Sequence, residues 1–159
     1  MSTPEVGPVP EGYHTVTPYL ILDDATATID FYKRAFDATV KFSMEMGPGK
    51  IGHAELLIGN SHIMLADEHP DMGALSPKTV GGCPLFLHLY VEDSDTVFNQ
   101  AVAAGGEVIR PLQDQFFGDR PGTLKDSFGV QWPISTHVEY VSPEELERRQ
   151  QAMAKREAC

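Results

Sequence analysis

The chain has 159 residues, which suits one domain or two small modules packed together, and 42% of them are apolar, as in ordinary soluble globular proteins. The formal net charge is −11, from 23 acidic and 12 basic side chains, and argues against nucleic acid or an anionic membrane as a general partner. Two cysteines, Cys83 and Cys159, form neither a metal motif nor a disulfide framework, which fits a reducing cytoplasm. We expect no signal peptide and no membrane span, because no basic leader and no long apolar run is present.

The first half of the sequence predicts one strand, one helix and then three strands. Residues 1–12 are rich in Pro and Gly and predict a flexible arm. A β-branched and aromatic strand follows, and Asp23-Asp24 then supplies an N-cap for a helix with an apolar stripe. Alternating segments separated by Gly-rich turns predict the remaining strands. The expected ranges are 14–22, 25–36, 39–46, 50–58 and 62–66.

The second half repeats this order after a loop. Residues 67–84 are predicted to be loop throughout. The next predicted elements are a strand over 85–91, a helix over 95–104, a strand over 107–111, and two strands within 116–137 joined by an Asp…Gly turn. In the tail, Ser142 and Pro143 are a typical helix start, and the charged helix is expected to run to about residue 158.

The two halves can be superimposed in sequence at an offset of about 69 residues. Leu22-Asp23-Asp24 falls on Val91-Glu92-Asp93, and Gly59 falls close to Gly129. Residue identity between the halves is poor, but the order of elements is the same. We therefore predict five parts: an arm (1–12), a first βαβββ module (13–66), a linker loop (67–84), a second βαβββ module (85–141) and a C-terminal helix (142–159).

Several motifs together resemble the vicinal oxygen chelate superfamily, which contains glyoxalases, bleomycin-resistance proteins and dioxygenases, and in particular its PhnB-like branch. These motifs are Pro18-Tyr19-Leu20, the helix segment 29–36, His53-Ala54-Glu55-Leu56, Leu65-Ala66-Asp67-Glu68, Tyr90-Val91-Glu92-Asp93, and the stretch from Gly118 to His137. The resemblance implies an α+β fold in which two βαβββ modules form a curved sheet that encloses a cavity. It also implies a homodimer.

Enzymes of this superfamily hold a divalent metal with His, Gln or Glu from the first and last strands of each module. By the resemblance, the matching positions here are Thr17, Phe86, Pro133, and Ile63 or Met64. These side chains are poor ligands for a hard or borderline cation. We therefore expect no cofactor. A divalent metal on other residues is the alternative, and His53, Glu55 and His88 are its candidates; His53 and Glu55 are two apart on a strand and share one face.

The resemblance also indicates which residues bind a ligand. The residues expected to line the cavity are Tyr19, Phe86, His88 and Tyr90, and those expected in a loop at its mouth are Phe116, Phe117 and Arg120, where an arginine beside aromatic rings suits a planar or anionic molecule. His62 and His137 are interpreted as structural, and Trp132 as packed beneath a helix. No nucleophilic cysteine and no Ser-His-Asp signature is found.

These observations lead to one expected function and two alternatives. The first is a cytoplasmic, metal-free binding protein that sequesters a small aromatic or amphipathic molecule by burial and stacking. An enzyme is the less favoured interpretation; it would be a metal-dependent lyase, isomerase or dioxygenase whose metal acts as a Lewis acid. A third possibility is a housekeeping protein whose ligand is not a drug.

Overall fold

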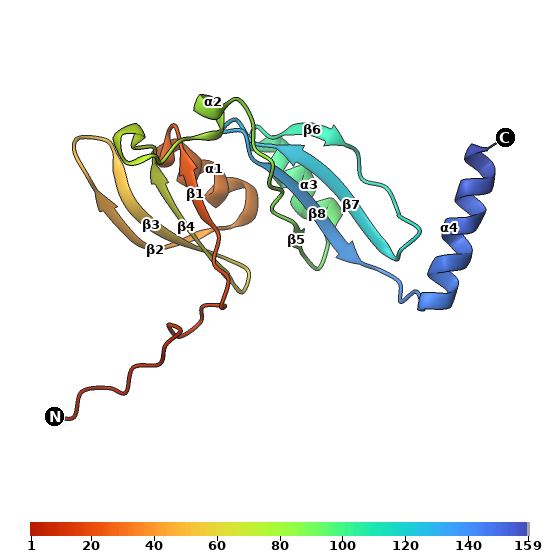
Figure 1. The fold of residues 1–159 in the computed structure, drawn as a ribbon, viewed down its shortest axis with the longest axis horizontal. Helices are drawn as coiled ribbons and strands as arrows, with labels where there is room; N and C mark the ends of the chain where they lie inside the picture. The colour runs from red at the N-terminus through yellow and green to blue at the C-terminus, as the bar shows by residue number, and fades with distance from the viewer. Residues whose placement is uncertain (159) are drawn as a thin grey trace. The chain divides into compact units, whose positions relative to one another are not determined.

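The computed structural model describes residues 1–158, so Cys159 and the predictions that involve it lie outside the described part of the chain. Contacts between residues divide the chain into two compact units, Met1–Pro84 and the segment from Leu85 onward. Each unit contains one four-stranded sheet and one long helix against it (Figure 1). The chain is thus α+β with two βαβββ units, as the sequence predicted.

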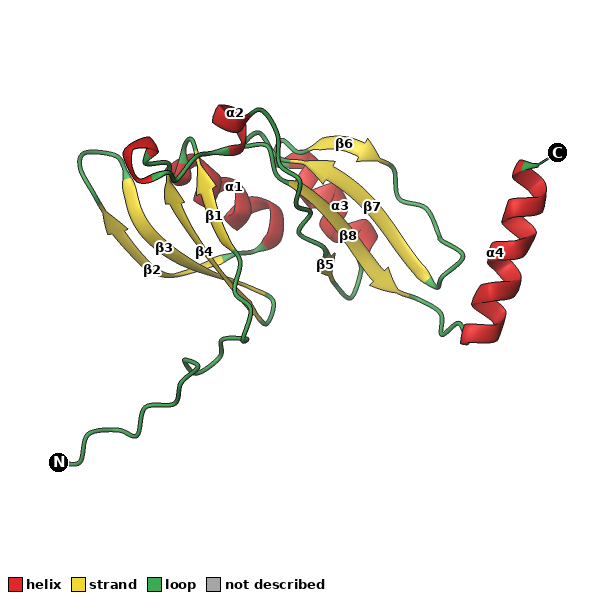
Figure 2. Cartoon of the chain, viewed as in Figure 1, coloured by secondary structure: helices red, strands yellow, loops and turns green. Residues whose placement is uncertain are grey.

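The first unit contains β1 (Tyr19–Leu22), α1 (Ala25–Phe36), β2 (Thr39–Glu45), β3 (Ile51–Ile58) and β4 (Ser61–Asp67). The strands lie in the order β1-β4-β3-β2. Strands β1 and β4 are parallel, whereas the β2–β3 and β3–β4 pairs are antiparallel. A 3-10 turn (Pro70–Met72) and a short helix α2 (Pro77–Val80) follow β4 (Figure 2).

The second unit repeats this topology with β5 (Leu89–Tyr90), α3 (Ser94–Ala103), β6 (Glu107–Arg110), β7 (Asp119–Lys125) and β8 (Gln131–His137). Its strand order is β5-β8-β7-β6, with β5 parallel to β8 and the other neighbours antiparallel. Helix α4 (Pro143–Glu157) ends the described chain. No helix within residues 1–158 is long and apolar enough to cross a membrane.

Side-chain caps fix where the long helices begin. The Asp24 carboxylate accepts a hydrogen bond from the backbone N–H of Ala27, and Asp93 accepts from Asp95 and Thr96. Ser142 does the same for Glu145, with Pro143 in the first turn. Each cap satisfies backbone donors that have no partner inside the helix.

One face of each sheet packs on a helix and the other face is open. Alternate residues of the strands point to opposite faces, so the buried positions identify the helix side. On that side lie Leu20, Leu22, Ala54, Leu56, Ile63 and Leu65 in the first unit, and Leu124, Trp132 and Ile134 in the second. The burial of Trp132 agrees with its predicted place beneath a helix. The residues between these positions form the two open faces, which are the surfaces considered below for function.

In each unit, the backbone N–H of the first residue of the helix donates a hydrogen bond to a side chain near the end of the last strand. In the first unit the Asp67 carboxylate at the end of β4 accepts from the N–H of Ala25, the first residue of α1, at 2.9 Å, and from Ile51 at 2.7 Å. In the second unit the Thr136 hydroxyl near the end of β8 accepts from Ser94, the first residue of α3, at 2.8 Å. This shared bond ties the last strand of each unit to its helix and is direct structural support for the internal repeat.

A buried aspartate holds the turn between β7 and β8. Asp126 accepts hydrogen bonds from the backbone N–H groups of Phe128 (3.0 Å) and Val130 (2.9 Å) and from the indole Nε1–H of Trp132 (3.1 Å). Its turn is completed by Gly129 at a positive φ of 99°. The predicted Asp…Gly hairpin is therefore present, and its carboxylate also positions the core tryptophan.

Three predicted segments differ from the structure, and each difference involves proline. The first strand was predicted over 14–22 but begins at Tyr19, after Pro18. The strand predicted over 85–91 is regular only at Leu89–Tyr90, with an isolated bridge between Phe86 and Gln131. Pro133 of the neighbouring β8 has no N–H to donate, which accounts for the interrupted ladder. The segment 67–84, predicted as loop, contains the 3-10 turn and α2, which both start at a proline.

Candidate functional site

The open face of the first sheet carries a chain of hydrogen-bonded polar side chains. The Tyr19 hydroxyl contacts His53 Nδ1 at 2.8 Å, and His53 Nε2 contacts Glu55 Oε1 at 3.1 Å. The other oxygen of Glu55 accepts a hydrogen bond from the hydroxyl of Tyr13. The Tyr13 ring in turn stacks on His62, with 3.9 Å between ring centroids. Tyr13, which lies in the segment before β1, therefore joins the side chains of β3. We call Tyr13, Tyr19, His53 and Glu55 the first cluster.

Hydrogen bonds and desolvation shift the pKa values of three members of the first cluster, Glu55, Tyr13 and Tyr19. Hydrogen bonds from Tyr13 and then His53 lower the pKa of Glu55, so its carboxylate is charged at neutral pH. Desolvation, followed by the hydrogen bond to Glu55, raises the pKa of Tyr13 to about 12. Desolvation and the negative charge of Glu55 also raise the pKa of Tyr19. Both phenols consequently stay protonated at neutral pH, and the Tyr13 hydroxyl donates to Glu55.

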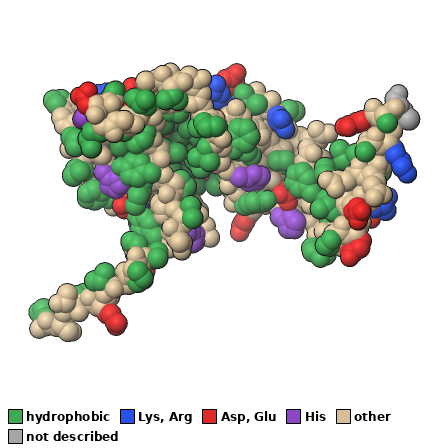
Figure 3. Space-filling view, in the orientation of Figure 1, with side chains coloured by type: hydrophobic (Ala, Val, Ile, Leu, Met, Phe, Trp, Pro, Cys, Tyr) green, Lys and Arg blue, Asp and Glu red, His purple; other side chains and the backbone are tan. Residues whose placement is uncertain are grey.

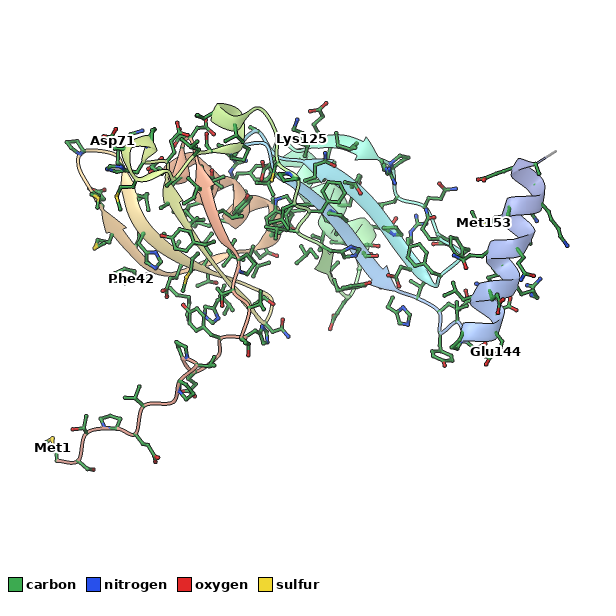
Figure 4. The ribbon with its side chains drawn as sticks, viewed as in Figure 1. Met1, Phe42, Asp71, Lys125, Glu144 and Met153 are labelled. Carbon is green, nitrogen blue, oxygen red and sulfur yellow. The ribbon has the colours of Figure 1, made fainter. Side chains whose placement is uncertain are left out.

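Apolar side chains on the same face surround this cluster. Strand register places Phe42 opposite Glu55 and Met44 opposite His53. Phe42, Met44 and Tyr19 are 49%, 48% and 46% exposed. Figure 4 labels Phe42 on β2, and its ring centroid lies 6.1 Å from that of His53. This face thus combines exposed apolar surface with a few fixed polar groups, as small-molecule sites do.

The open face of the second sheet contains a different polar cluster. The Tyr90 hydroxyl donates to Asp119 Oδ2 at 2.7 Å, and His137 Nδ1 contacts Asp119 Oδ1 at 2.7 Å. His88 stacks on Tyr90 with 4.6 Å between ring centroids. The Asp119 side chain is only 7% exposed, whereas that of His137 is 59% exposed. The buried carboxylate therefore orients an imidazole that is largely exposed to solvent.

Two opposing effects set the ionisation of Asp119. Desolvation is the largest single effect and raises the pKa of its carboxyl, but hydrogen bonds from His137 and Tyr90, with the charges of His137 and His88, outweigh it and lower the pKa. The hydrogen bond to Asp119, ahead of desolvation, raises the pKa of Tyr90. Beside this cluster, Ser135 is fully buried and its hydroxyl has no hydrogen-bond partner within residues 1–158. Its strand neighbours are Tyr90 and Pro121, so it belongs to the same face.

The second unit also has a hollow of about 360 Å³, the size of a small-ligand site. Its lining comes from β6, β7 and the segment between them: Arg110, Pro111, Gln113, Gln115, Phe117, Pro121, Gly122 and Thr123. Pro121 lies two residues from Asp119 along β7, so the hollow and the polar cluster share one face of the sheet. Figure 3 shows histidines (purple) among hydrophobic side chains (green) on the surface of each unit.

Comparison with known proteins identifies the family. The family model described as "Glyoxalase/Bleomycin resistance protein/Dioxygenase superfamily" matches residues 13–134. The chain belongs to this superfamily. An uncharacterized protein of Mycobacterium bovis, Mb0911c, is 40% identical over 136 residues, which are 83% of this chain and 89% of that protein.

Solved structures of other proteins share the fold of this chain. TioX from Micromonospora sp. ML1 is 24% identical, with a TM-score of 0.62 over 79% of this chain and 99% of TioX. A PhnB protein from Bacillus cereus, described as a putative 3-demethylubiquinone-9 3-methyltransferase, is 23% identical, with a TM-score of 0.59 over 77% of this chain and 99% of that protein. At these identities the likeness concerns the fold alone.

A metal is the usual cofactor of this superfamily's enzymes, and the side chains present here do not fit one. Both ring nitrogens of His53 are engaged, one with Tyr19 and one with Glu55. His88, the third candidate ligand, stacks on Tyr90 with 4.6 Å between ring centroids. Across residues 1–158, no three side chains of His, Cys, Asp or Glu come together as a metal-binding group.

The predicted ligand-binding residues of this superfamily member fall into different environments. Tyr19 belongs to the first cluster, and Tyr90 and His88 to the second, while Phe86 is exposed beside the interrupted ladder. Phe116 and Phe117 pack edge to face, with 5.4 Å between ring centroids, and Phe117 lines the hollow. Their roles in binding stay predictions.

The predicted position of Arg120 is wrong. It was expected in a loop beside the aromatic pair, but it lies on β7. Its guanidinium contacts Asp95 of α3 at 2.8 and 3.0 Å and Asp114 at 3.2 Å. The alternation of β7 sends it to the helix side, away from Asp119 and Pro121. Arg120 therefore forms an ion pair that joins β7 to α3.

Sequence reasoning missed Asp119 as a functional candidate and interpreted His137 as structural. A signal was available in the hairpin. Counting outward from the Asp126–Gly129 turn along two antiparallel strands brings Asp119 opposite His137, and the observed register has this pair. Arg110 was also passed over, because it lies in a short, wholly exposed strand with no motif of its own.

Proposed function

We propose that this chain binds a small aromatic or amphipathic molecule on its open sheet faces, without a metal and without making or breaking a bond. The observation that carries the proposal is the first open face, where Tyr19, Phe42 and Met44 leave about half of their surface exposed around a polar cluster whose hydrogen bonds are satisfied. Exposed aromatic and thioether surface of this kind gains free energy when a ligand covers it. The protonated phenols and the Glu55 carboxylate would orient the ligand's polar atoms. Cytoplasmic location and homodimer formation are part of the same proposal.

The His53 contacts argue for binding rather than Lewis-acid chemistry. A zinc-ligating histidine offers one ring nitrogen to the metal and usually donates from the other to an outer partner. Here a phenol and a carboxylate occupy both nitrogens. Recruiting His53 to a metal would break the contact with Tyr19 or with Glu55. We propose instead that the cluster forms a fixed polar surface against which the ligand binds.

A neutral fluorescent probe, N-phenyl-1-naphthylamine, tests this function. We expect its fluorescence to rise on titration with tag-free protein treated with EDTA, and to be unchanged when Zn²⁺ or Mn²⁺ is then added. About half of the Phe42 side chain is still exposed, so covering it is worth about 0.8–1.5 kcal/mol, and Phe42→Ala should raise the Kd about three- to tenfold. Val40→Ala on the same strand is the matched control, because Val40 pairs with Leu56, whose side chain points to the helix side.

The opposite outcome would favour an enzyme. If EDTA-treated protein fails to bind the probe, while protein as purified holds a stoichiometric transition metal that His53→Ala removes, the metal-dependent lyase, isomerase or dioxygenase becomes the better interpretation. Elemental analysis of the purified wild type and of His53→Ala gives this answer independently of the probe.

A further inference from the structure

We infer that the hollow of the second unit binds the carboxylate of a small aromatic acid, and that Arg110 is its ionic partner. This inference rests on the proposed function, because it specifies the chemical class of the bound molecule. It depends on three features: how the backbone builds the hollow, how the charges nearby are already paired, and which donors and apolar surfaces remain.

The segment after β6 runs beside β7 in a strand-like manner. The backbone N–H of Gln113 donates to the Pro121 carbonyl at 3.1 Å, and that of Gln115 donates to the Asp119 carbonyl at 2.8 Å. Side chains along such a segment alternate between the two faces. Gln113, Gln115 and Phe117 consequently line the hollow, and the residues between them point the other way.

The same alternation separates the charges. Leu112 and Asp114 lie on the helix side, where Leu112 approaches Gly122 and Asp114 contacts Arg120 at 3.2 Å. Arg120 also holds Asp95, so one arginine takes up two aspartates. Arg110 is exposed on the other face, and we find no ion pair for it among residues 1–158. The hollow therefore has an uncompensated positive charge in a chain whose net charge is −11.

The remaining lining suits an aromatic carboxylate. A guanidinium presents paired N–H donors that match the two oxygens of a carboxylate. The amides of Gln113 and Gln115 and the hydroxyl of Thr123 add neutral donors at the same wall. Pro111, Phe117 and Pro121 supply the apolar and aromatic surface against which a ring can pack. One cation with neutral donors favours a monoanion over a more highly charged group, since the surrounding protein is acidic.

Two probes with the same aromatic ring test the inference: 2-naphthoate, which is a carboxylate at pH 7, and 2-naphthalenemethanol, which is neutral. Isothermal titration calorimetry at constant ionic strength gives both affinities for the full chain. We expect 2-naphthoate to bind the wild type about tenfold more tightly than the alcohol, as a charge-assisted hydrogen bond provides. Arg110→Gln should abolish this preference by weakening the binding of 2-naphthoate. Arg34→Gln is the control, because Arg34 lies on α1 of the first unit and makes the same change in net charge.

Amide chemical shifts locate the probe. In ¹H–¹⁵N spectra, 2-naphthoate should shift the resonances of Gln113, Gln115 and Phe117 in the wild type, and these spectra also show whether each variant is folded. Equal affinities for acid and alcohol, or a preference that survives Arg110→Gln, would overturn the inference while leaving the proposed function in place. Failure of both probes to bind would overturn the inference; the N-phenyl-1-naphthylamine titration then decides the proposed function separately.

Discussion

Replacing Asp126 gives a sharp test of how the second unit is held together. Its carboxylate accepts at least three hydrogen bonds, from two backbone N–H groups and from the Trp132 indole, and is nearly inaccessible to solvent. Asp126→Ala leaves three buried donors without an acceptor. At about 1–3 kcal/mol for each unsatisfied donor, the variant should lose at least about 3 kcal/mol of unfolding free energy.

Asp126→Asn is the graded control. The amide keeps one oxygen, which can still accept from the N–H groups of Phe128 and Val130, but its NH₂ group faces the indole N–H of Trp132. The expected loss is therefore that of one donor, about 1–2 kcal/mol. A graded series keeps the measurement informative if the alanine variant is close to unfolded.

The assay is urea denaturation followed by tryptophan fluorescence. Trp132 is the only tryptophan of the chain, so its emission reports the second unit. With a slope of about 1 kcal/mol per molar urea for so small a unit, Asp126→Ala should lower the midpoint by about 3 M and Asp126→Asn by about 1–2 M. Midpoints of both variants within about 0.5 M of the wild type would refute the assigned role of this carboxylate.

Three further predictions concern the first cluster, the hydrogen bond that ties the last strand of each unit to its helix, and a glycine. Because the pKa of Tyr13 is raised to about 12, the stability that its hydroxyl provides is complete below pH 10.0 and is lost as the pH rises toward 12, so the difference in urea midpoint between wild type and Tyr13→Phe should shrink over this range. Ultraviolet titration of wild type minus Tyr13→Phe should show a phenol that ionises near pH 12. Glu55→Gln should lower the Tyr13 pKa only part of the way, since desolvation is the larger cause. Asp67→Ala, which removes acceptors for Ala25 and Ile51, should cost about 2–4 kcal/mol by calorimetry. Thr136→Val, which removes the acceptor for Ser94 and the donor to the Val91 carbonyl, should cost about as much; a loss below about 1 kcal/mol in either variant would contradict the assigned role. Gly118→Ala should lose at least about 2 kcal/mol in urea denaturation, because Gly118 has a φ of +99° and an added Cβ would lie 2.1 Å from the Glu139 carbonyl oxygen; a neutral effect would show that the strand end relaxes freely.

The parts of the fold that sequence predicted well are those with a local cause. Helix α1 was placed at its observed bounds because Asp24 caps it and the apolar stripe has helical spacing. Helix α2 was missed although Ser76-Pro77 is the same start signal as Ser142-Pro143, since only one short turn follows it. The irregular β5 could not be predicted from its own residues, because the proline that interrupts its ladder lies on another strand.

The site was harder to predict because its contacts join residues distant in sequence. His53 and Glu55 were paired correctly from their spacing on one strand, but Tyr13 lies 42 positions before Glu55 and carries no motif that points to it. Arg120 was assigned to ligand binding because aromatic residues precede it, whereas strand alternation and the aspartates of the helix side decide its contacts. Arg120 forms ion pairs with Asp95 and Asp114, whereas the uncompensated charge belongs to Arg110. The two arginines can be distinguished only when the partners of all nearby charged side chains are known.

The hydrogen bond that ties the last strand to the helix in both units has a consequence for how internal repeats are detected. An aspartate at position 67 and a threonine at position 136 meet the same need, an oxygen for the first N–H of the helix. In a duplicated chain, drift can exchange one side chain for another as long as the acceptor is kept. Percentage identity between the halves then records the drift and hides the common origin. A search that compares which positions supply a hydrogen-bond acceptor, rather than which residue type occupies them, would find repeats of low sequence identity in other chains.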